Sequence, residues 1–130
     1  MRELFDIHSF KASKHVTKLY STSFYAGVRF LDEKIRNDVH GIYGFVRFAD
    51  EIVDSFHKQD KEQLLNEFVE NTYKAIERKI SLNPILNSFQ MVVNKYQIDH
   101  SLIDQFLHSM RMDLNPMEYT QESYEEYILG

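Results

Sequence analysis

The chain has 130 residues, of which 43% are hydrophobic and 14% aromatic, and its formal net charge is −5. This length and composition exclude an intrinsically disordered chain and fit one folded domain with its own core. The negative charge argues against a nucleic-acid-binding surface. Cysteine is absent, which excludes disulfides, thiol catalysis and cysteine-bound metals. A reducing cytoplasm is the location we expect.

Glycine and proline are scarce, with four and two residues, so long helices are expected. Apolar spacing and capping residues predict helices at about 9–20, 24–31, 33–57, 61–80, 85–96 and 100–112. A last helix is expected to begin at Thr120 and to continue to Gly130. Asp32, Asp60 and Asp99 are candidate N-caps. The sequence therefore predicts an all-α protein without repeats or linkers.

Polar side chains on one face of the helix predicted at 33–57 form a candidate site. At about 100° per residue, Tyr43, Arg47, Asp50 and Asp54 fall within roughly 60° of arc, apart from the apolar residues. The two aspartates lie one turn apart and repel each other, and a divalent cation between them removes this repulsion. Mg²⁺ is suited to such a pair, because carboxylates and substrate phosphates are its usual ligands.

Two further features suit a phosphate group. Arg47 can bind phosphate through two parallel hydrogen bonds. The Ser-Thr-Ser stretch at 21–23 places hydroxyls near a predicted helix N-terminus, where anions are stabilised. A plainer interpretation is a solvated carboxylate face, a surface ion pair of Arg47 with Asp50 or Asp54, and a serine that only caps a helix. Spacing alone leaves both interpretations open.

The order of these motifs resembles the squalene/phytoene synthase family of head-to-head prenyltransferases. That family has a Ser-x-Ser-Phe stretch, an arginine in the linker, a Tyr-x-Phe-x-Arg element and an Asp-rich D-D-x-x-D motif. In this sequence the matching residues are Ser21-Thr22-Ser23-Phe24, Arg36, Tyr43-Gly44-Phe45-Val46-Arg47 and Asp50-Glu51-Ile52-Val53-Asp54. A weaker match at 110–130 resembles the approach to the family's Tyr-x-x-Gly helix.

The resemblance implies an all-α isoprenoid synthase fold and gives roles to the matching residues. The metal ligands for Mg²⁺ would be Asp50 and Asp54, with Glu51 in an outer role. The catalytic residues would be Asp50, Asp54, Arg47 and Tyr43. The residues that bind diphosphate would be Ser21, Ser23 and Arg47. The residues that line the hydrocarbon channel or face the cavity would be Phe24, Tyr43, Asp113 and Tyr127.

The implied reaction condenses two allylic prenyl diphosphates, either geranylgeranyl or farnesyl diphosphate. One diphosphate ionises to an allylic cation, and the double bond of the other attacks it. We expect a phytoene synthase of carotenoid biosynthesis. A squalene synthase, which would also need NADPH, is the alternative within the family, and a non-catalytic helical interaction module is the alternative from another class.

This chain departs from the family in its length. Members are roughly twice as long, judged by usual domain size, and carry a second Asp-rich motif, but no other D-x-x-x-D pair follows Asp54 here. We therefore expect residues 1–130 to be the N-terminal portion of such a domain and to be inactive alone. The apolar surface left uncovered would favour self-association.

Two remaining features have structural interpretations. The basic run KASKHVTK at 11–18 is expected to be a solvated helix face, with peripheral contact to an anionic membrane as the alternative. No apolar run approaches the length of a membrane span. His40 falls beside the polar stripe and is expected at a cavity edge rather than as a metal ligand.

Overall fold

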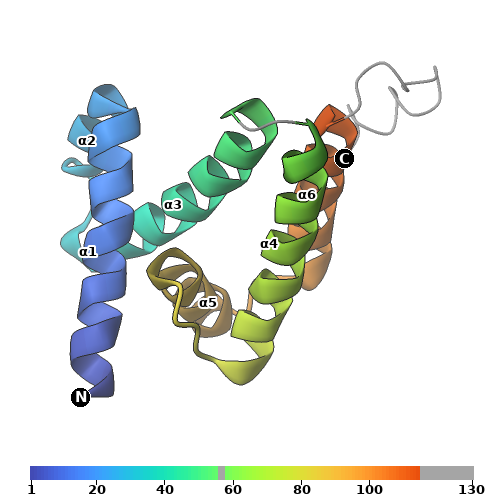
Figure 1. Ribbon diagram of the computed structural model, residues 1–130. Helices are drawn as coiled ribbons and strands as arrows, with labels where there is room; N and C mark the ends of the chain where they lie inside the picture. The colour runs from blue at the N-terminus through green and yellow to red at the C-terminus, as the bar shows by residue number, and fades with distance from the viewer. Residues whose placement is uncertain (56–57, 115–130) are drawn as a thin grey trace.

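Residues 1–55 and 58–114 are described by the structure, which is a computed structural model (Figure 1). This part of the chain contains helices and no strand, so the predicted all-α architecture is confirmed. The helices are α1 (Arg2–Tyr20), α2 (Thr22–Val28), α3 (Glu33–Ser55), α4 (Lys58–Arg78), α5 (Pro84–Tyr96) and α6 (His100–Leu114). The helix expected after Thr120 lies outside the described residues.

Helices α3 and α5 lie in the middle of the molecule, with α1 and α2 on one side and α4 and α6 on the other (Figure 1). Most helix ends fall within a few residues of the predictions. Asp32 and Asp99 accept hydrogen bonds from Lys34 N and Ser101 N, each at 2.9 Å, as expected of caps. Asp60 is not a cap, because α4 begins two residues before it.

The start of α1 was not predicted. The helix begins at Arg2 rather than near residue 9, and its most buried positions include Ser9, Ser13 and Thr17, none of which is exposed to solvent. Leu19, an apolar residue near the end of this helix, is 67% exposed. The helix therefore turns small polar side chains inward, and a search for apolar spacing finds too little signal there.

The main core surrounds Phe45 of α3. Its ring stacks on Phe89 of α5 with 3.7 Å between centroids and on Phe68 of α4 at 5.2 Å, and it contacts Phe106 of α6 at 5.7 Å. Aromatic burial of this kind contributes large apolar area together with favourable ring contacts. One side chain of α3 thus joins three other helices, and it holds the opposite, polar face of α3 in a fixed direction.

Two glycines of α3 let α1 and α5 approach its backbone. A Cβ atom added at Gly44 would lie 3.0 Å from Ser13 Oγ, and one at Gly41 would lie 3.1 Å from Val92 Cγ2. Both positions are buried. Glycine is therefore required here for close helix packing, not for an unusual backbone angle.

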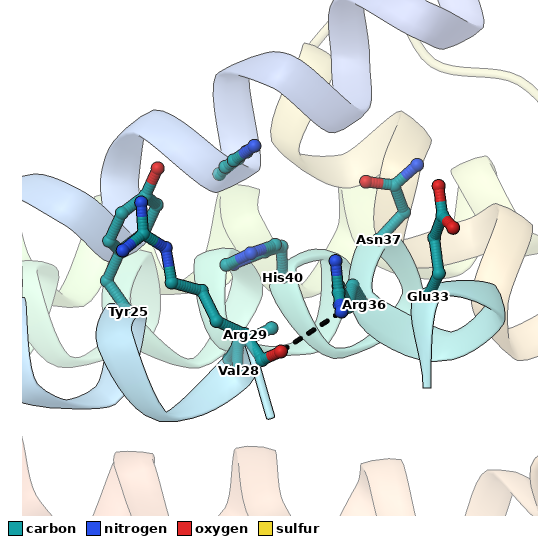
Figure 2. A pocket seen from close by; sticks show the side chains of 8 residues that line it. Tyr25, Val28, Arg29, Glu33, Arg36, Asn37 and His40 are labelled. Atoms are coloured by element: carbon teal, nitrogen blue, oxygen red, sulfur yellow. Dashed lines mark hydrogen bonds between the residues drawn. The ribbon is translucent and has the colours of Figure 1, made fainter. Parts of the chain in front are cut away.

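The turn between α2 and α3 is held by one arginine. Arg36 donates from Nε to the carbonyl oxygen of Leu31 and from Nη2 to that of Arg29, both at 3.0 Å. Figure 2 shows the bond to Arg29. The last carbonyl groups of a helix lack partners within the helix, and a cation there is favourable. Arg36, the linker arginine of the sequence motif, therefore fixes the position of α2 on α3.

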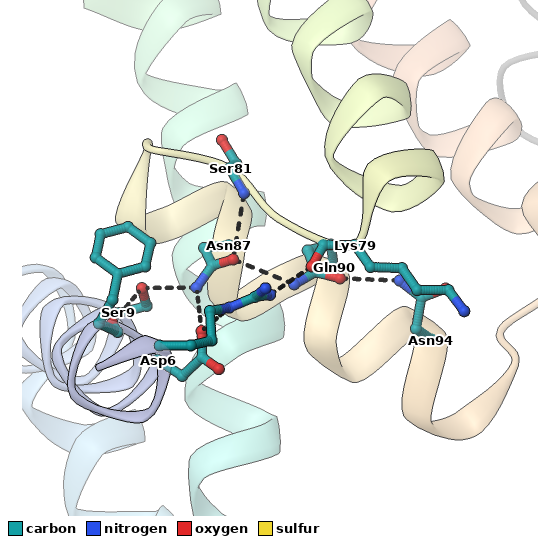
Figure 3. A network of polar contacts seen from close by, with 9 residues as sticks. Asp6, Ser9, Lys79, Ser81, Asn87, Gln90 and Asn94 are labelled. Carbon is teal, nitrogen blue, oxygen red and sulfur yellow. Dashed lines mark hydrogen bonds and ion pairs between the residues drawn. The ribbon is translucent and has the colours of Figure 1, made fainter.

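A buried polar network joins α1 to α5 (Figure 3). Asn87 Nδ2 donates to Asp6 Oδ1 at 2.9 Å and to Ser9 Oγ at 3.0 Å, while Asn87 Oδ1 accepts from Gln90 Nε2 at 3.2 Å. Because the amide is used on both sides, its burial leaves no polar atom unpaired. The network sets the position of α1, whose last residue, Tyr20, reaches the candidate site.

Candidate active site

The candidate site lies on the C-terminal half of α3. Phe45, Ala49 and Val53 of this segment are buried in the core, whereas Asp50 is partly buried and Asp54 is exposed. The predicted separation of a polar stripe from an apolar face is therefore confirmed. The two aspartates project from successive turns of one helix, as their spacing requires.

Arg47 is held from two sides. Its Nη2 forms an ion pair with Glu51 Oε2 at 3.1 Å, and its guanidinium lies over the Tyr20 ring at 4.5 Å from the centroid. The plainer interpretation paired Arg47 with Asp50 or Asp54, but the ion pair is made with Glu51, one full turn along the helix. Arg47 Nε is buried and has no hydrogen-bond partner among the described residues.

Glu51 is engaged in contacts within α3, and its outer role at the metal site stays a prediction. Hydrogen bonds from Ser55 Oγ, at 2.8 Å, and from Arg47 lower the pKa of its carboxyl group. Both carboxylate oxygens are therefore occupied within the helix. Glu51 orients the arginine and leaves Asp50 and Asp54 as the carboxylates of the stripe that are not paired with it.

Negative charge gathers around Asp50. Burial raises the pKa of its carboxyl group, and although Arg47 lowers it, the carboxylates of Asp54 and Asp113 raise it further. Asp113 belongs to α6, so the structure brings this predicted site residue to the stripe on α3 from a distant part of the sequence. Such crowding of carboxylates at one place is unfavourable without a cation.

The Ser-Thr-Ser turn acts as a helix cap. Ser21 Oγ accepts a hydrogen bond from Phe24 N at 3.1 Å and is the N-cap of α2. Ser23 is exposed, and no hydrogen bond of its side chain is found within the described residues. The capping interpretation of Ser21 is therefore confirmed, while the diphosphate roles of Ser21 and Ser23 stay predictions.

An aromatic pair adjoins the polar stripe. The rings of Phe24 and Tyr43 stack with 4.9 Å between centroids and an interplanar angle of 20°. Phe24 remains 42% exposed, so one side of the pair is open to solvent. Phe24 and Tyr43, which the family resemblance places along the hydrocarbon channel, are thus side by side.

A comparison with protein families decides the membership of this chain. A model of the squalene/phytoene synthase family matches residues 17–129. The chain belongs to the squalene/phytoene synthase family. This family is a group of prenyltransferases of isoprenoid biosynthesis with an all-α isoprenoid synthase fold, and the helices described above agree with it. No curated protein sequence matches the chain.

The squalene/phytoene synthase match includes every motif residue discussed here, and also Tyr127, which lies outside the described residues.

Within residues 1–55 and 58–114, no group of three or more histidine, aspartate or glutamate side chains is arranged to hold a metal ion. Asp50 and Asp54 therefore supply two carboxylate ligands, and the remaining ligands of a metal ion would have to come from water or substrate. In the same part of the chain, no helix is long and apolar enough to cross a membrane.

Sequence reasoning missed one member of the site, Tyr20. The residue directly precedes the Ser-Thr-Ser turn, but nothing in the spacing of α1 indicates that its ring lies under Arg47. That contact depends on the angle at which α1 crosses α3. The ion pair between Arg47 and Glu51, by contrast, could have been predicted, because the two residues lie four apart, at the spacing of a helical ion pair.

Proposed function

We propose that the protein functions as a head-to-head prenyltransferase of the phytoene synthase type, which joins two allylic prenyl diphosphates, and that residues 1–130 carry one of the two carboxylate groups that this reaction needs. The observation that carries this proposal is the arrangement on α3, where the arginine and the aspartates adjoin the Phe24–Tyr43 pair. A prenyl diphosphate has the same two parts, a dianionic or trianionic head and an apolar, unsaturated tail. The site therefore matches the substrate class in both charge and hydrophobicity.

The donor set fits Mg²⁺. Asp50 and Asp54 present carboxylate oxygens one turn apart, and Mg²⁺ is commonly held by one or two carboxylates together with waters and substrate phosphates. The burial and carboxylate repulsion that raise the pKa of Asp50 would be relieved by a cation. When bound, Mg²⁺ supplies positive charge that stabilises the diphosphate leaving group.

Arg47 would bind the departing diphosphate. The Tyr20 ring below it and Glu51 beside it fix the direction of the guanidinium before substrate arrives. A hydrogen-bond donor that is already in position needs little reorganisation when negative charge develops on the leaving group. A diphosphate oxygen would also satisfy the Nε–H of Arg47, which is buried without a partner among the described residues.

In the reaction, the C–O bond of one allylic diphosphate breaks, and its electron pair leaves with the diphosphate. The double bond of the second molecule then attacks the allylic cation, and loss of one proton gives a cyclopropyl intermediate that keeps the second diphosphate. Departure of that diphosphate leaves a second cation, which rearranges and loses a second proton to give phytoene. The faces of Phe24 and Tyr43 would stabilise the cation by cation–π attraction and would help to exclude water. Asp113 and Tyr127 are proposed to face the same cavity.

Calorimetry with Mg²⁺ and a non-hydrolysable prenyl diphosphate tests this proposal. We expect Asp50→Ala and Asp54→Ala to abolish Mg²⁺-dependent binding, because each removes one of the two carboxylates. Glu77→Gln is the matched control, since it also removes one negative charge, from an exposed position on α4. Binding that survives both aspartate variants would overturn the proposed site.

The same experiment separates the rival functions. If the wild-type chain binds no prenyl diphosphate, the interaction module is the better description. If it binds, a series of analogues based on geranylgeranyl and farnesyl diphosphate compares the two enzymes. We expect the geranylgeranyl analogue to bind more tightly, as a phytoene synthase requires, whereas preference for the farnesyl analogue would indicate squalene synthase.

A further inference from the structure

A pocket of about 290 Å³ lies between α1, α2 and the N-terminal half of α3 (Figure 2). It is built from a different part of α3 than the carboxylate stripe, because its last lining residue, His40, precedes Arg47 by two turns of helix. The residues that line it are Lys14, Tyr25, Val28, Arg29, Glu33, Arg36, Asn37 and His40.

The pocket concentrates positive charge in an acidic protein. Lys14, Arg29 and Arg36 line it, and Glu33 is its only carboxylate, whereas the whole chain has a net charge of −5. None of these four residues takes part in an ion pair found within the described residues. Positive side chains that converge on a concave surface attract anions far more strongly than scattered surface charges do.

Arg36 is oriented before any ligand arrives. Its two hydrogen bonds to the carbonyl groups of Leu31 and Arg29 fix the guanidinium at the wall of the pocket. By contrast, the side chains of Lys14 and Arg29 donate no hydrogen bond to any described residue, and the Arg29 guanidinium lies 6.0 Å from the centroid of the Tyr25 ring. The pocket therefore contains one guanidinium group, that of Arg36, which is fixed by hydrogen bonds. The N–H donors of Lys14 and Arg29 are available to a ligand.

His40 adds a titratable group to the same wall. Thr17 Oγ1 donates its proton to the Ser13 carbonyl at 3.1 Å, so at 3.0 Å from His40 Nδ1 it must accept, which places a proton on Nδ1. The other ring nitrogen, Nε2, has no hydrogen-bond partner among the described residues. Burial, and then the charge of Lys14, lower the pKa of the ring, so without a ligand His40 is neutral near pH 7.

We propose that this pocket binds the phosphate group of a small phosphorylated molecule or of a lipid headgroup. Arginine and lysine are the side chains best suited to phosphate, by charge and by number of donors. The volume is near the lower limit of small-molecule pockets and leaves room for a phosphate ester beyond a single phosphate ion. This inference does not depend on the proposed prenyltransferase activity, because the two sites share no residue.

Binding of inorganic pyrophosphate without Mg²⁺, measured by calorimetry, tests the pocket. We expect Lys14→Gln and Arg29→Gln each to weaken binding by about tenfold, the effect of losing one charge-assisted hydrogen bond. Both side chains are exposed and make no hydrogen bond to the described chain, so the variants should fold, which circular dichroism checks. Lys34→Gln is the matched control, because it makes the same change of charge on α3 outside the pocket.

A further variant separates this site from the carboxylate stripe. In an Arg47→Gln background, which removes the diphosphate-binding arginine of the stripe, Lys14→Gln and Arg29→Gln should still weaken the Mg²⁺-independent pyrophosphate binding that remains. The proposal is overturned if Lys14→Gln, Arg29→Gln and Lys34→Gln bind alike, or if Arg47→Gln alone abolishes binding. Failure of the prenyltransferase proposal is recognised by a different result. In that case Asp50→Ala and Asp54→Ala would leave the Mg²⁺-dependent binding of a prenyl diphosphate unchanged.

The source of the phosphate is resolved with vesicles. Sedimentation with vesicles of phosphatidylcholine, with and without phosphatidic acid, is compared for the wild type and for Arg29→Gln. Sedimentation that requires both phosphatidic acid and Arg29 identifies a lipid headgroup. Pyrophosphate binding without such sedimentation identifies a soluble phosphate ester, and absence of both overturns the proposal.

His40 provides a readout within the pocket that needs no substitution. The groups that face its ring are Lys14 of α1, Tyr25 of α2, Arg29 at the C-cap of α2, and Glu33 and Arg36 of α3. A bound anion favours the imidazolium, so ligand should raise the pKa of His40, and affinity should increase as pH falls. Sulfate is the probe, because its own charge is constant at neutral pH. An NMR titration of His40 that sulfate does not shift, with exposed His8 as the internal reference, contradicts the assignment.

Discussion

At the scale of single residues, Asp50 shows a conflict between stability and the proposed activity. Its pKa in the folded protein is raised, first by burial and then by Asp54 and Asp113, against the lowering effect of Arg47. A carboxyl group whose folded pKa exceeds its unfolded pKa favours folding at low pH, and this contribution is lost as pH rises through the folded pKa. At neutral pH, the ionised Asp50 side chain therefore destabilises the fold.

We predict that Asp50→Asn raises the melting temperature at pH 7 while abolishing the Mg²⁺-dependent binding of a prenyl diphosphate. The amide removes a charge that is unfavourable at this position, and it removes a metal ligand at the same time. The gain in melting temperature should shrink as pH falls toward the pKa of Asp50, because the wild-type side chain then becomes neutral too. Thermal melts at several pH values measure this, and a variant less stable than wild type at pH 7 would contradict the electrostatic argument.

At the scale of helices, the contact of α1 with α3 depends on a glycine. A Cβ at Gly44 would meet Ser13 Oγ at 3.0 Å and Ser13 Cβ at 3.2 Å, closer than ordinary contact, whereas a Cβ at Gly27 of α2 would meet nothing within 4 Å. Both glycines are helical. They therefore form a matched pair in which one position is crowded and the other is open.

We predict opposite signs for alanine at these two positions. Gly27→Ala should increase the free energy of unfolding by up to about 1 kcal/mol, the difference in helix propensity. Gly44→Ala gains the same propensity but forces α1 away from α3, and overpacking of this kind costs roughly 1–3 kcal/mol. A net decrease is expected, measured by urea unfolding. If Gly44→Ala increases the free energy of unfolding as much as Gly27→Ala does, α1 can move away from α3 at little energetic cost.

The helices also show which parts of the structure the sequence could predict. Apolar spacing found α3, α5 and α6, because these helices bury aliphatic and aromatic side chains. It missed the first turns of α1, since the buried side of that helix is built from serine and threonine. Likewise the alignment of Asp50 and Asp54 followed from helix geometry, but the Tyr20 contact with Arg47 depends on helix crossing, which no local spacing encodes.

At the scale of the whole molecule, α3 connects two regions of opposite charge. Its N-terminal half, with Arg36 and His40, forms the wall of the basic pocket, and its C-terminal half carries the aspartates. Between them, Phe45 anchors the helix in the core. Anions would be attracted to the first region directly, and to the second through a cation and Arg47. Removal of divalent metal should therefore affect ligand binding only at the second.

The full reaction requires more than one group of carboxylates. The proposed reaction must neutralise two diphosphates, and Asp50 and Asp54 are the only D-x-x-x-D pair in the sequence of 130 residues. We predict that this chain alone forms no phytoene or squalene from labelled geranylgeranyl or farnesyl diphosphate, with Mg²⁺ and NADPH present. Extraction of the product into organic solvent and chromatography measure this directly.

The controls for this assay must show whether a lack of product is caused by the missing second carboxylate group or by misfolding of the chain. The same sample should bind a prenyl diphosphate analogue in the presence of Mg²⁺, which shows that the site on α3 is intact. A synthase with both Asp-rich motifs, assayed in parallel, shows that the substrates and conditions permit turnover. Because one carboxylate pair can hold one diphosphate but leaves the other un-neutralised, binding without turnover is the expected result. Product above the uncatalysed background would show that a single pair suffices.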